Sequence, residues 1–154
     1  MRRLLSSGLI VLAGAASISP QQVYRTPWKM SVGDVRLAVL RHFFEKFDCP
    51  AAAYASEFLS AADTYQLDWR LLPSISFVES AGGKAAPNNN IFGWDNGRAQ
   101  FATPVAGIYK VARQLAYSDV YRNKDLDTVL TVYNPIGPYA RSVKSVMQQI
   151  APLE

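Results

Sequence analysis

Glu79 is the residue whose place in the sequence best suits acid–base chemistry. Leu72, Ile75 and Glu79 are three and then four residues apart, so a helix would carry all three on one face. Burial against apolar groups penalises a carboxylate and can raise a glutamate pKa from about 4.3 to about 6. Such an acid stays protonated near neutral pH and can donate a proton to a glycosidic oxygen. The spacing equally suits a structural glutamate bonded to local backbone donors or to Lys84, so both roles stay open here.

No second carboxylate stands out as a partner for Glu79. The other acids have structural explanations, because they lie on polar helix faces, in turns or where they can cap helices. Hydrolases of the retaining or inverting kind use two carboxyl groups roughly 5 to 9 Å apart. Asp95 is the best remaining candidate, although it is also placed to form an ion pair with Arg98 across a turn.

Amide and aromatic side chains gather just after the predicted acid. Three asparagines at positions 88–90 are followed by Phe92 and Trp94. Amides bind sugar hydroxyl and N-acetyl groups, and aromatic rings pack on the apolar faces of pyranoses. The same residues can also cap turns and pack a loop onto the core, which is the better explanation for Phe92. Tyr133 ends an apolar helical face next to Asn134, where its hydroxyl can reach a cleft or its ring can simply fill the core.

A set of short amphipathic helices must position these residues. Apolar residues recur at helical spacing in six segments, which begin near Leu37, Ala55, Leu72, Val105, Leu126 and Tyr139. Thr103 and Pro104 provide a helix cap and a first-turn proline for the fourth segment. Pro73 requires the third helix to begin a little after Asp68 or to bend. The pattern predicts a mainly α fold.

The Asn96-Gly97 pair predicts a tight turn between two short strands. Counting outward from it gives three opposed pairs: Asp95 with Arg98, Trp94 with Ala99, and Phe92 with Phe101. We therefore expect a single mainly α domain over residues 32–154 that carries one small two-stranded β-hairpin.

The first 19 residues have the pattern of a secretory signal peptide. Arg2 and Arg3 precede an apolar stretch, which is followed by small residues that suit a cleavage site. The apolar stretch of about 13 residues is short of the roughly 20 that span a bilayer, so an uncleaved anchor is the weaker interpretation. Residues 20–31 are expected to be a linker. The protein is thus predicted to be exported to the periplasm, the cell envelope or the extracellular space, with membrane contact only through the signal segment.

Composition excludes several classes of function. The chain has 154 residues, 49% of them hydrophobic and 18% charged, which is typical of one globular domain. Its formal charge of +4 falls by two when Arg2 and Arg3 leave with the signal, and the other basic residues are interleaved with acids, which argues against nucleic acid. A single cysteine, Cys49, and a single histidine, His42, offer no disulfide and no metal cluster. We expect a monomer that needs no cofactor.

Three ordered motifs resemble the lysozyme-like superfamily, which contains bacterial endo-β-N-acetylglucosaminidases and soluble lytic transglycosylases. Residues 71–80 resemble the family's helix that ends in a Glu-Ser pair. Residues 89–94, Asn-Asn-Ile-Phe-Gly-Trp, resemble the Asn-Asn-x-Phe-Gly motif of the glucosaminidases. Residues 132–135, with Tyr139 soon after, are similar to the Tyr-Asn motif that places a tyrosine near the acid of transglycosylases. The resemblance covers roughly residues 52–150.

The resemblance implies an enzyme that cleaves the glycan strands of peptidoglycan. Glu79 would be the general acid, and Tyr133 would help to stabilise the reacting sugar. The expected substrate-binding residues are Ser80, Asn89, Asn90, Phe92, Trp94, Asp95 and Asn134. A single acid would suit intramolecular attack that gives an anhydro product, participation by the N-acetyl group, or attack by water with an unidentified base. The second hypothesis is a non-catalytic domain of the same fold that binds cell-wall glycan or supports an envelope assembly.

Overall fold

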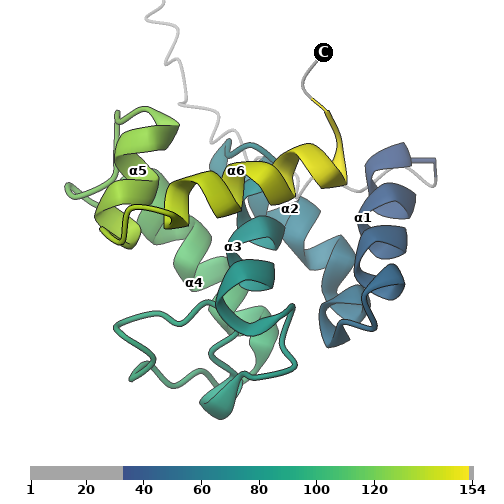
Figure 1. The fold of residues 1–154 in the computed structure, drawn as a ribbon. Coiled ribbons are helices and arrows are strands. Elements are labelled where there is room, and N and C mark those ends of the chain that lie inside the picture. Colours follow the sequence, from purple (N-terminus) through teal and green to yellow (C-terminus); the bar gives the residue numbers. More distant parts are fainter. Residues whose placement is uncertain (1–32, 153–154) are drawn as a thin grey trace, which may run out of the picture.

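The computed structural model describes residues 33–152. The predicted signal peptide and linker lie outside this range. Within it the chain forms α1 (Val35–Lys46), α2 (Ala55–Tyr65), α3 (Leu71–Ser80), α4 (Pro104–Tyr117), α5 (Leu126–Tyr133) and α6 (Tyr139–Ile150) (Figure 1). Two short 3-10 helices, Pro50–Tyr54 and Pro87–Asn89, lie before α2 and after α3. The mainly α class predicted from the sequence is confirmed. None of the helices among these residues has the length and apolar character that a membrane crossing needs.

The central element is α3. Its first six residues, 71–76, are all buried, as expected of a helix that has neighbours all round. Figure 1 shows α6 running across α3, and the two helices are in extensive contact. The helix begins at Leu71, so Pro73 falls in the first turn, where the N–H that proline lacks would have no helical partner. This resolves the difficulty that Pro73 posed in the sequence.

Aromatic packing anchors the loop that follows α3. Phe44, Phe58 and Phe92 are fully buried, and their rings form a chain in which centroids lie 5.7 Å and 6.2 Å apart. Burying one such side chain contributes roughly 1.5–3 kcal/mol, so Phe92 fixes its loop firmly to the core. The expected pairing of Phe92 with Phe101 is therefore wrong. The Phe101 ring instead lies over Gly107, on α4.

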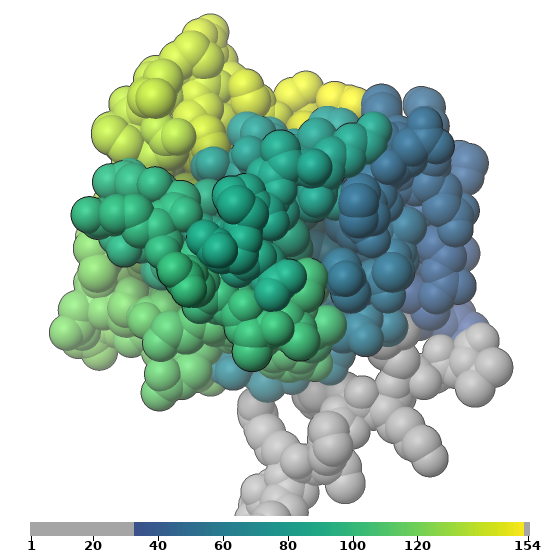
Figure 2. Space-filling model, turned by 90° about the horizontal axis from the view of Figure 1, so that it is seen from below, coloured from purple at the N-terminus to yellow at the C-terminus, as the bar shows by residue number. Residues whose placement is uncertain are grey.

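The segment between α3 and α4 covers the middle of the face shown in Figure 2. In its central part, residues 91–101, no residue has strand structure, so the expected hairpin is not formed. Four loop residues have positive φ, unlike a strand: Gly93, Asp95, Asn96 and Gly97. The Asn90 side chain explains the coiling, because it accepts a hydrogen bond from the Trp94 N–H at 2.9 Å and donates one to the Trp94 carbonyl at 3.0 Å.

Two of the contacts expected across the turn are present although the hairpin is not formed. Arg98 donates to Asp95 in an exposed ion pair with an N–O distance of 2.6 Å. The Ala99 N–H donates to the Trp94 carbonyl at 3.3 Å. Residues 94–99 thus form two of the contacts expected across a hairpin turn, but their backbone is a compact loop and not a pair of strands.

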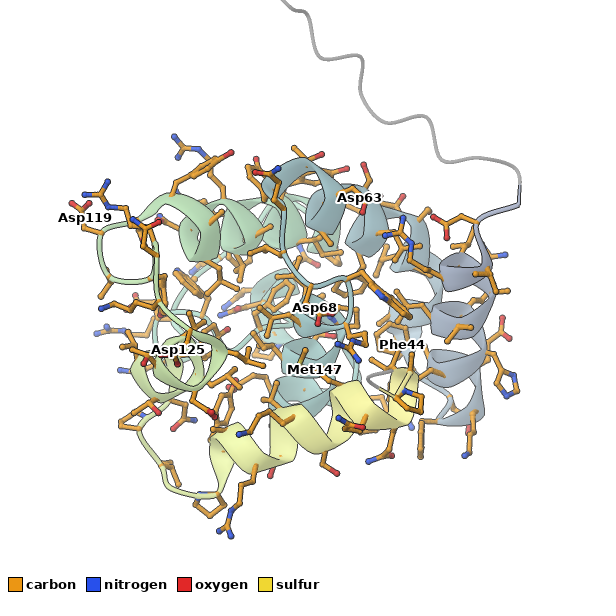
Figure 3. The ribbon with its side chains drawn as sticks, turned by 90° about the horizontal axis from the view of Figure 1, so that it is seen from above. Phe44, Asp63, Asp68, Asp119, Asp125 and Met147 are labelled. Carbon is orange, nitrogen blue, oxygen red and sulfur yellow. The ribbon has the colours of Figure 1, made fainter. Side chains whose placement is uncertain are left out.

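The side chains of Phe44 and Met147 are buried in the core, whereas Asp119 lies at the edge of the molecule (Figure 3). Five residues at helical spacing along α6 are buried, namely Tyr139, Val143, Val146, Met147 and Ile150. The apolar spacing of this helix therefore predicted its packing correctly.

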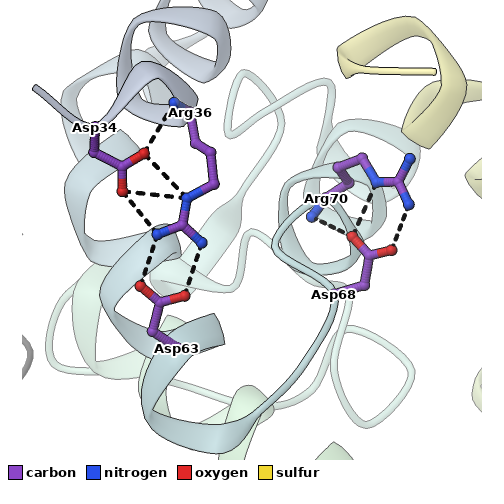
Figure 4. A network of polar contacts seen from close by, with 5 residues as sticks. All are labelled: Asp34, Arg36, Asp63, Asp68 and Arg70. Atoms are coloured by element: carbon purple, nitrogen blue, oxygen red, sulfur yellow. Dashed lines mark hydrogen bonds and ion pairs between the residues drawn. The ribbon is translucent and has the colours of Figure 1, made fainter. Parts of the chain in front are cut away.

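Arginine pairs join helices at two places (Figure 4). Arg36 donates to Asp34 and to Asp63, and so links the start of α1 to α2. Arg70, just before α3, donates to Asp68 and also to the Ala151 carbonyl, after α6, at 2.8 Å. Its side chain is only 8% exposed, so this second contact ties the central helix to the end of the fold.

Candidate functional site

Glu79 lies in the last turn of α3 and lines a cleft of about 1100 Å³. The helix ends directly after it, because Ala81 adopts a left-handed conformation and its N–H donates to the Phe77 carbonyl. The side chain of Glu79 is half-buried. The end of the central helix thus presents one carboxyl group to the cleft.

Burial raises the pKa of Glu79 above its usual value, and an interaction with the Tyr139 hydroxyl opposes this shift. The net direction is upward, so desolvation dominates. A carboxyl group in this environment holds its proton to higher pH than an exposed glutamate, which is the property that a general acid needs.

Tyr133 stands beside Glu79 at the end of α5. Its hydroxyl donates to the Phe92 carbonyl at 2.6 Å. Burial raises the pKa of Tyr133 well above its usual value, and the charges of Glu79 and Tyr121 add to the effect. The phenol therefore stays protonated, and its proton is held by the backbone of the loop. Its oxygen keeps lone pairs with which to accept a hydrogen bond.

The cleft has an aromatic wall. Trp94 lies edge-on to Tyr133, with centroids 5.5 Å apart, and is tilted against Tyr121 at 6.2 Å. Asn134 and the exposed Ile136 continue the lining beyond α5. Rings and an amide on one surface suit a ligand that has both apolar faces and polar edges, as a pyranose does.

Asp95 also lines the cleft, but its carboxylate is engaged by Arg98. Both side chains are more than half exposed. Glu79 and Asp95 are the only carboxyl groups among the described residues that line the cleft. Glu79 is thus the half-buried carboxyl group of the cleft, and Asp95 is the exposed one that forms an ion pair.

Four residues expected to bind substrate do not line the cleft. Ser80 is buried, and its hydroxyl donates to the Ile91 carbonyl at 2.8 Å and accepts from the Gly83 N–H. Both polar ends of the buried Asn90 amide bond to Trp94. The Asn89 side chain donates to the Phe101 carbonyl at 2.9 Å. The Phe92 ring fills the core. These four side chains hold the loop in place behind the wall.

The structure adds cleft residues that sequence reasoning missed. Gly93, Gln100, Lys110 and Tyr121 line the cleft. Tyr139 is a core residue of α6, but its hydroxyl also affects the pKa of Glu79. Helical spacing could not reveal this contact, because it joins two helices that are far apart in the sequence.

Among residues 33–152, no group of three or more His, Cys, Asp and Glu side chains is placed to hold a metal ion. The side chains that give the cleft its chemical character are those of Glu79, Tyr133, Tyr121 and Trp94. No protein-family model matches the chain, and no curated protein or solved structure matches it either.

Proposed function

We propose that the protein is an exported, lysozyme-like enzyme that cleaves the glycan strands of peptidoglycan, with Glu79 as its general acid. The observation that carries this proposal is the half-buried Glu79 carboxyl on the wall of a large cleft, with its pKa raised by burial. A protonated carboxylic acid is what a glycosidic oxygen requires in order to leave as an alcohol.

The cleft lining supports a sugar polymer as the substrate. Trp94 and Tyr121 offer ring faces, and Asn134 offers an amide, on the same surface as Glu79. The volume of about 1100 Å³ lies slightly above the usual range for small-ligand pockets, and it accommodates more than one sugar ring.

In the proposed reaction the Glu79 O–H gives its proton to the glycosidic oxygen as the bond from that oxygen to C1 breaks. The leaving sugar keeps the bonding electron pair and departs as a neutral alcohol, and positive charge develops at C1. The Tyr133 O–H donates its hydrogen bond to the Phe92 carbonyl, so the lone pairs of the tyrosine oxygen are free to face this charge. Glu79 is left as a carboxylate.

A second group must supply the electron pair that forms the new bond to C1. Asp95 is held by Arg98, so attack by the substrate's own hydroxyl or N-acetyl group fits the site better than attack by a protein carboxylate. An internal hydroxyl that gives its proton to the Glu79 carboxylate would form an anhydro product. N-acetyl participation followed by water, with the water proton returned to Glu79, would give a reducing end.

Glu79→Gln tests the acid assignment. We expect it to reduce the clearing of purified peptidoglycan in a zymogram by about 100-fold or more, because an amide cannot donate the proton. Glu45→Gln is the matched control, since Glu45 is an exposed residue of α1. Unchanged clearing by Glu79→Gln, with the fold intact by circular dichroism, would show the assignment to be wrong. Mass spectrometry of the released fragments then distinguishes anhydro from reducing products.

The engagement of Asp95 by Arg98 also favours a second candidate, a non-catalytic domain that binds cell-wall glycan or supports an envelope assembly. Wild-type protein that sediments with purified cell walls and releases no soluble fragments would select this alternative.

A further inference from the structure

The hydroxyl of Tyr139 is buried without a hydrogen-bond partner. Among the described residues only one other buried side-chain oxygen, Ser74 Oγ, shares this condition. Native proteins leave few buried polar groups unsatisfied, so each exception needs an explanation, and a catalytic role is one of them. A serine on a helix can rotate toward a backbone carbonyl, whereas the Tyr139 oxygen is fixed by its ring.

The surroundings hold the Tyr139 ring in one place. It stacks on Tyr133 with a centroid distance of 5.9 Å and an angle of 4° between the planes, and its side chain is 7% exposed. It is the first residue of α6, the helix that crosses α3. The position of its oxygen relative to Glu79 is thus set by the packing of two helices.

The Tyr139 hydroxyl lies close enough to the Glu79 carboxyl to affect its pKa, although no hydrogen bond of standard geometry joins the two groups in this structure. This interaction lowers the pKa of Glu79, against the larger effect of burial. Burial, followed by the nearby Tyr133 and Glu79, raises the pKa of Tyr139 far above its usual range. Tyr139 therefore keeps its proton near neutral pH and can act there as a hydrogen-bond donor.

We propose, on the basis of the function proposed above, that Tyr139 is a positioning residue whose hydroxyl donates a hydrogen bond to the Glu79 carboxylate formed when the acid gives up its proton. A hydrogen bond to an ionised carboxylate is about twice as strong as one between neutral groups. The bond therefore strengthens as the proton leaves Glu79, which stabilises the transition state more than the ground state.

Three of the four other titratable groups that line the cleft are less able to do this. The titratable side chains that share the cleft with it are Asp95, Lys110, Tyr121 and Tyr133. Tyr133, from α5, already donates its hydroxyl hydrogen bond to the Phe92 carbonyl. The Asp95 carboxylate accepts from Arg98 in an exposed ion pair, and Lys110 is an exposed residue of α4. Tyr139, from α6, is the buried donor without another partner.

Tyr139→Phe tests the inference, since it removes the hydroxyl and keeps the ring. Carbon-13 NMR of the labelled Glu79 carboxyl should show its pKa rising by about one unit. With peptidoglycan, kcat should fall about tenfold while KM stays constant, and the basic limb of the pH profile should move upward with the pKa. The matched control is Tyr109→Phe. The Tyr109 hydroxyl donates to Ser60 Oγ at 2.9 Å outside the cleft, so its loss should leave the Glu79 pKa, kcat, KM and the pH profile unchanged.

A Glu79 pKa that is the same in Tyr139→Phe and the wild type would overturn the inference, even if the variant is less stable. If the variant does not fold, the wild type provides the test. A hydrogen-bonded hydroxyl gives the ionised Glu79 carboxyl an isotope shift between light and heavy water, and its absence would also overturn the inference. Failure of the proposed function is distinguishable, because it appears as a wild-type protein that releases no fragments while Tyr139→Phe still shifts the Glu79 pKa.

Discussion

Gly93 lies against the carboxyl of Glu79 with no room for a side chain between them. A Cβ atom at Gly93 would stand 3.1 Å from Glu79 Cδ and closer still to Oε2. The φ of Gly93 is +58°, a conformation that glycine adopts freely and other residues rarely adopt. The missing side chain therefore gives the Glu79 carboxyl its place on the cleft wall.

Gly93→Ala should impair activity more than it impairs folding. The added methyl group must displace the Glu79 carboxyl, and a displacement of about 1 Å can reduce a rate by about 100-fold. The strained backbone should cost about 1–2 kcal/mol in the free energy of unfolding. The measurements are kcat on purified peptidoglycan and urea unfolding. Gly137→Ala is the control, since a Cβ there would meet no atom within 4 Å. A normal rate in Gly93→Ala would contradict the prediction.

Activity should decline as pH rises through the Glu79 pKa, which burial places above the ordinary value of 4.5. The same shift affects stability. A folded-state pKa above the unfolded value means that the charged form is disfavoured by folding, so stability falls as pH rises through this range. Glu79→Gln should therefore unfold at a higher temperature than the wild type at pH 8 and at nearly the same temperature near pH 4. A variant that is less stable than the wild type at pH 8 would refute this.

The helix boundaries could be predicted where local chemistry determines them. Thr103 Oγ1 accepts from the Ala106 N–H at 3.1 Å, and Pro104 follows as the first residue of α4. Asp125 similarly caps α5 through the Thr128 N–H at 2.8 Å. These contacts span three residues, so the sequence pattern contains everything needed to recognise them.

The loop after α3 could not be predicted in the same way, because a side-chain contact within it and a packing contact with α2 together determine its shape. The Asn96-Gly97 pair indicates a hairpin, but the Asn90 side chain and the burial of Phe92 against Phe58 bend the chain into turns instead. Tyr121 was missed for a related reason, since it reaches the cleft beside the predicted Trp94 and Tyr133 only through tertiary packing.

Gly82→Ala should destabilise the fold through packing. A Cβ at Gly82 would lie 2.7 Å from Cys49 Cβ and 2.9 Å from its Sγ, and both residues are buried. We expect a loss of about 2–4 kcal/mol, from overpacking and backbone strain together. Gly97→Ala separates the two causes, because its φ of +79° brings the strain while no atom lies within 4 Å of the new Cβ. Equal losses in urea unfolding would show that the Cys49 contact contributes nothing.

Arg70→Met should be more costly than Arg98→Met, although each removes one cation from an aspartate pair. The Arg70 side chain is 8% exposed and also bonds to the Ala151 carbonyl, whereas Arg98 is 71% exposed. We expect a loss of about 2–3 kcal/mol for Arg70 and at most about 0.5 kcal/mol for Arg98, measured by urea unfolding at pH 7.

Acid should narrow the difference between these two variants. Burial disfavours the Asp68 carboxylate, but the hydrogen bonds from Arg70 outweigh it and lower the pKa of Asp68 below the ordinary 3.8. A depressed folded-state pKa contributes stability above pH 3.8 that is lost as pH falls through the lower folded value. Unfolding of the Arg70 and Arg98 variants at pH 7 and at about pH 2 checks this. A gap that stays constant would mean that Arg70 stabilises the fold through Ala151 and its packing rather than through Asp68.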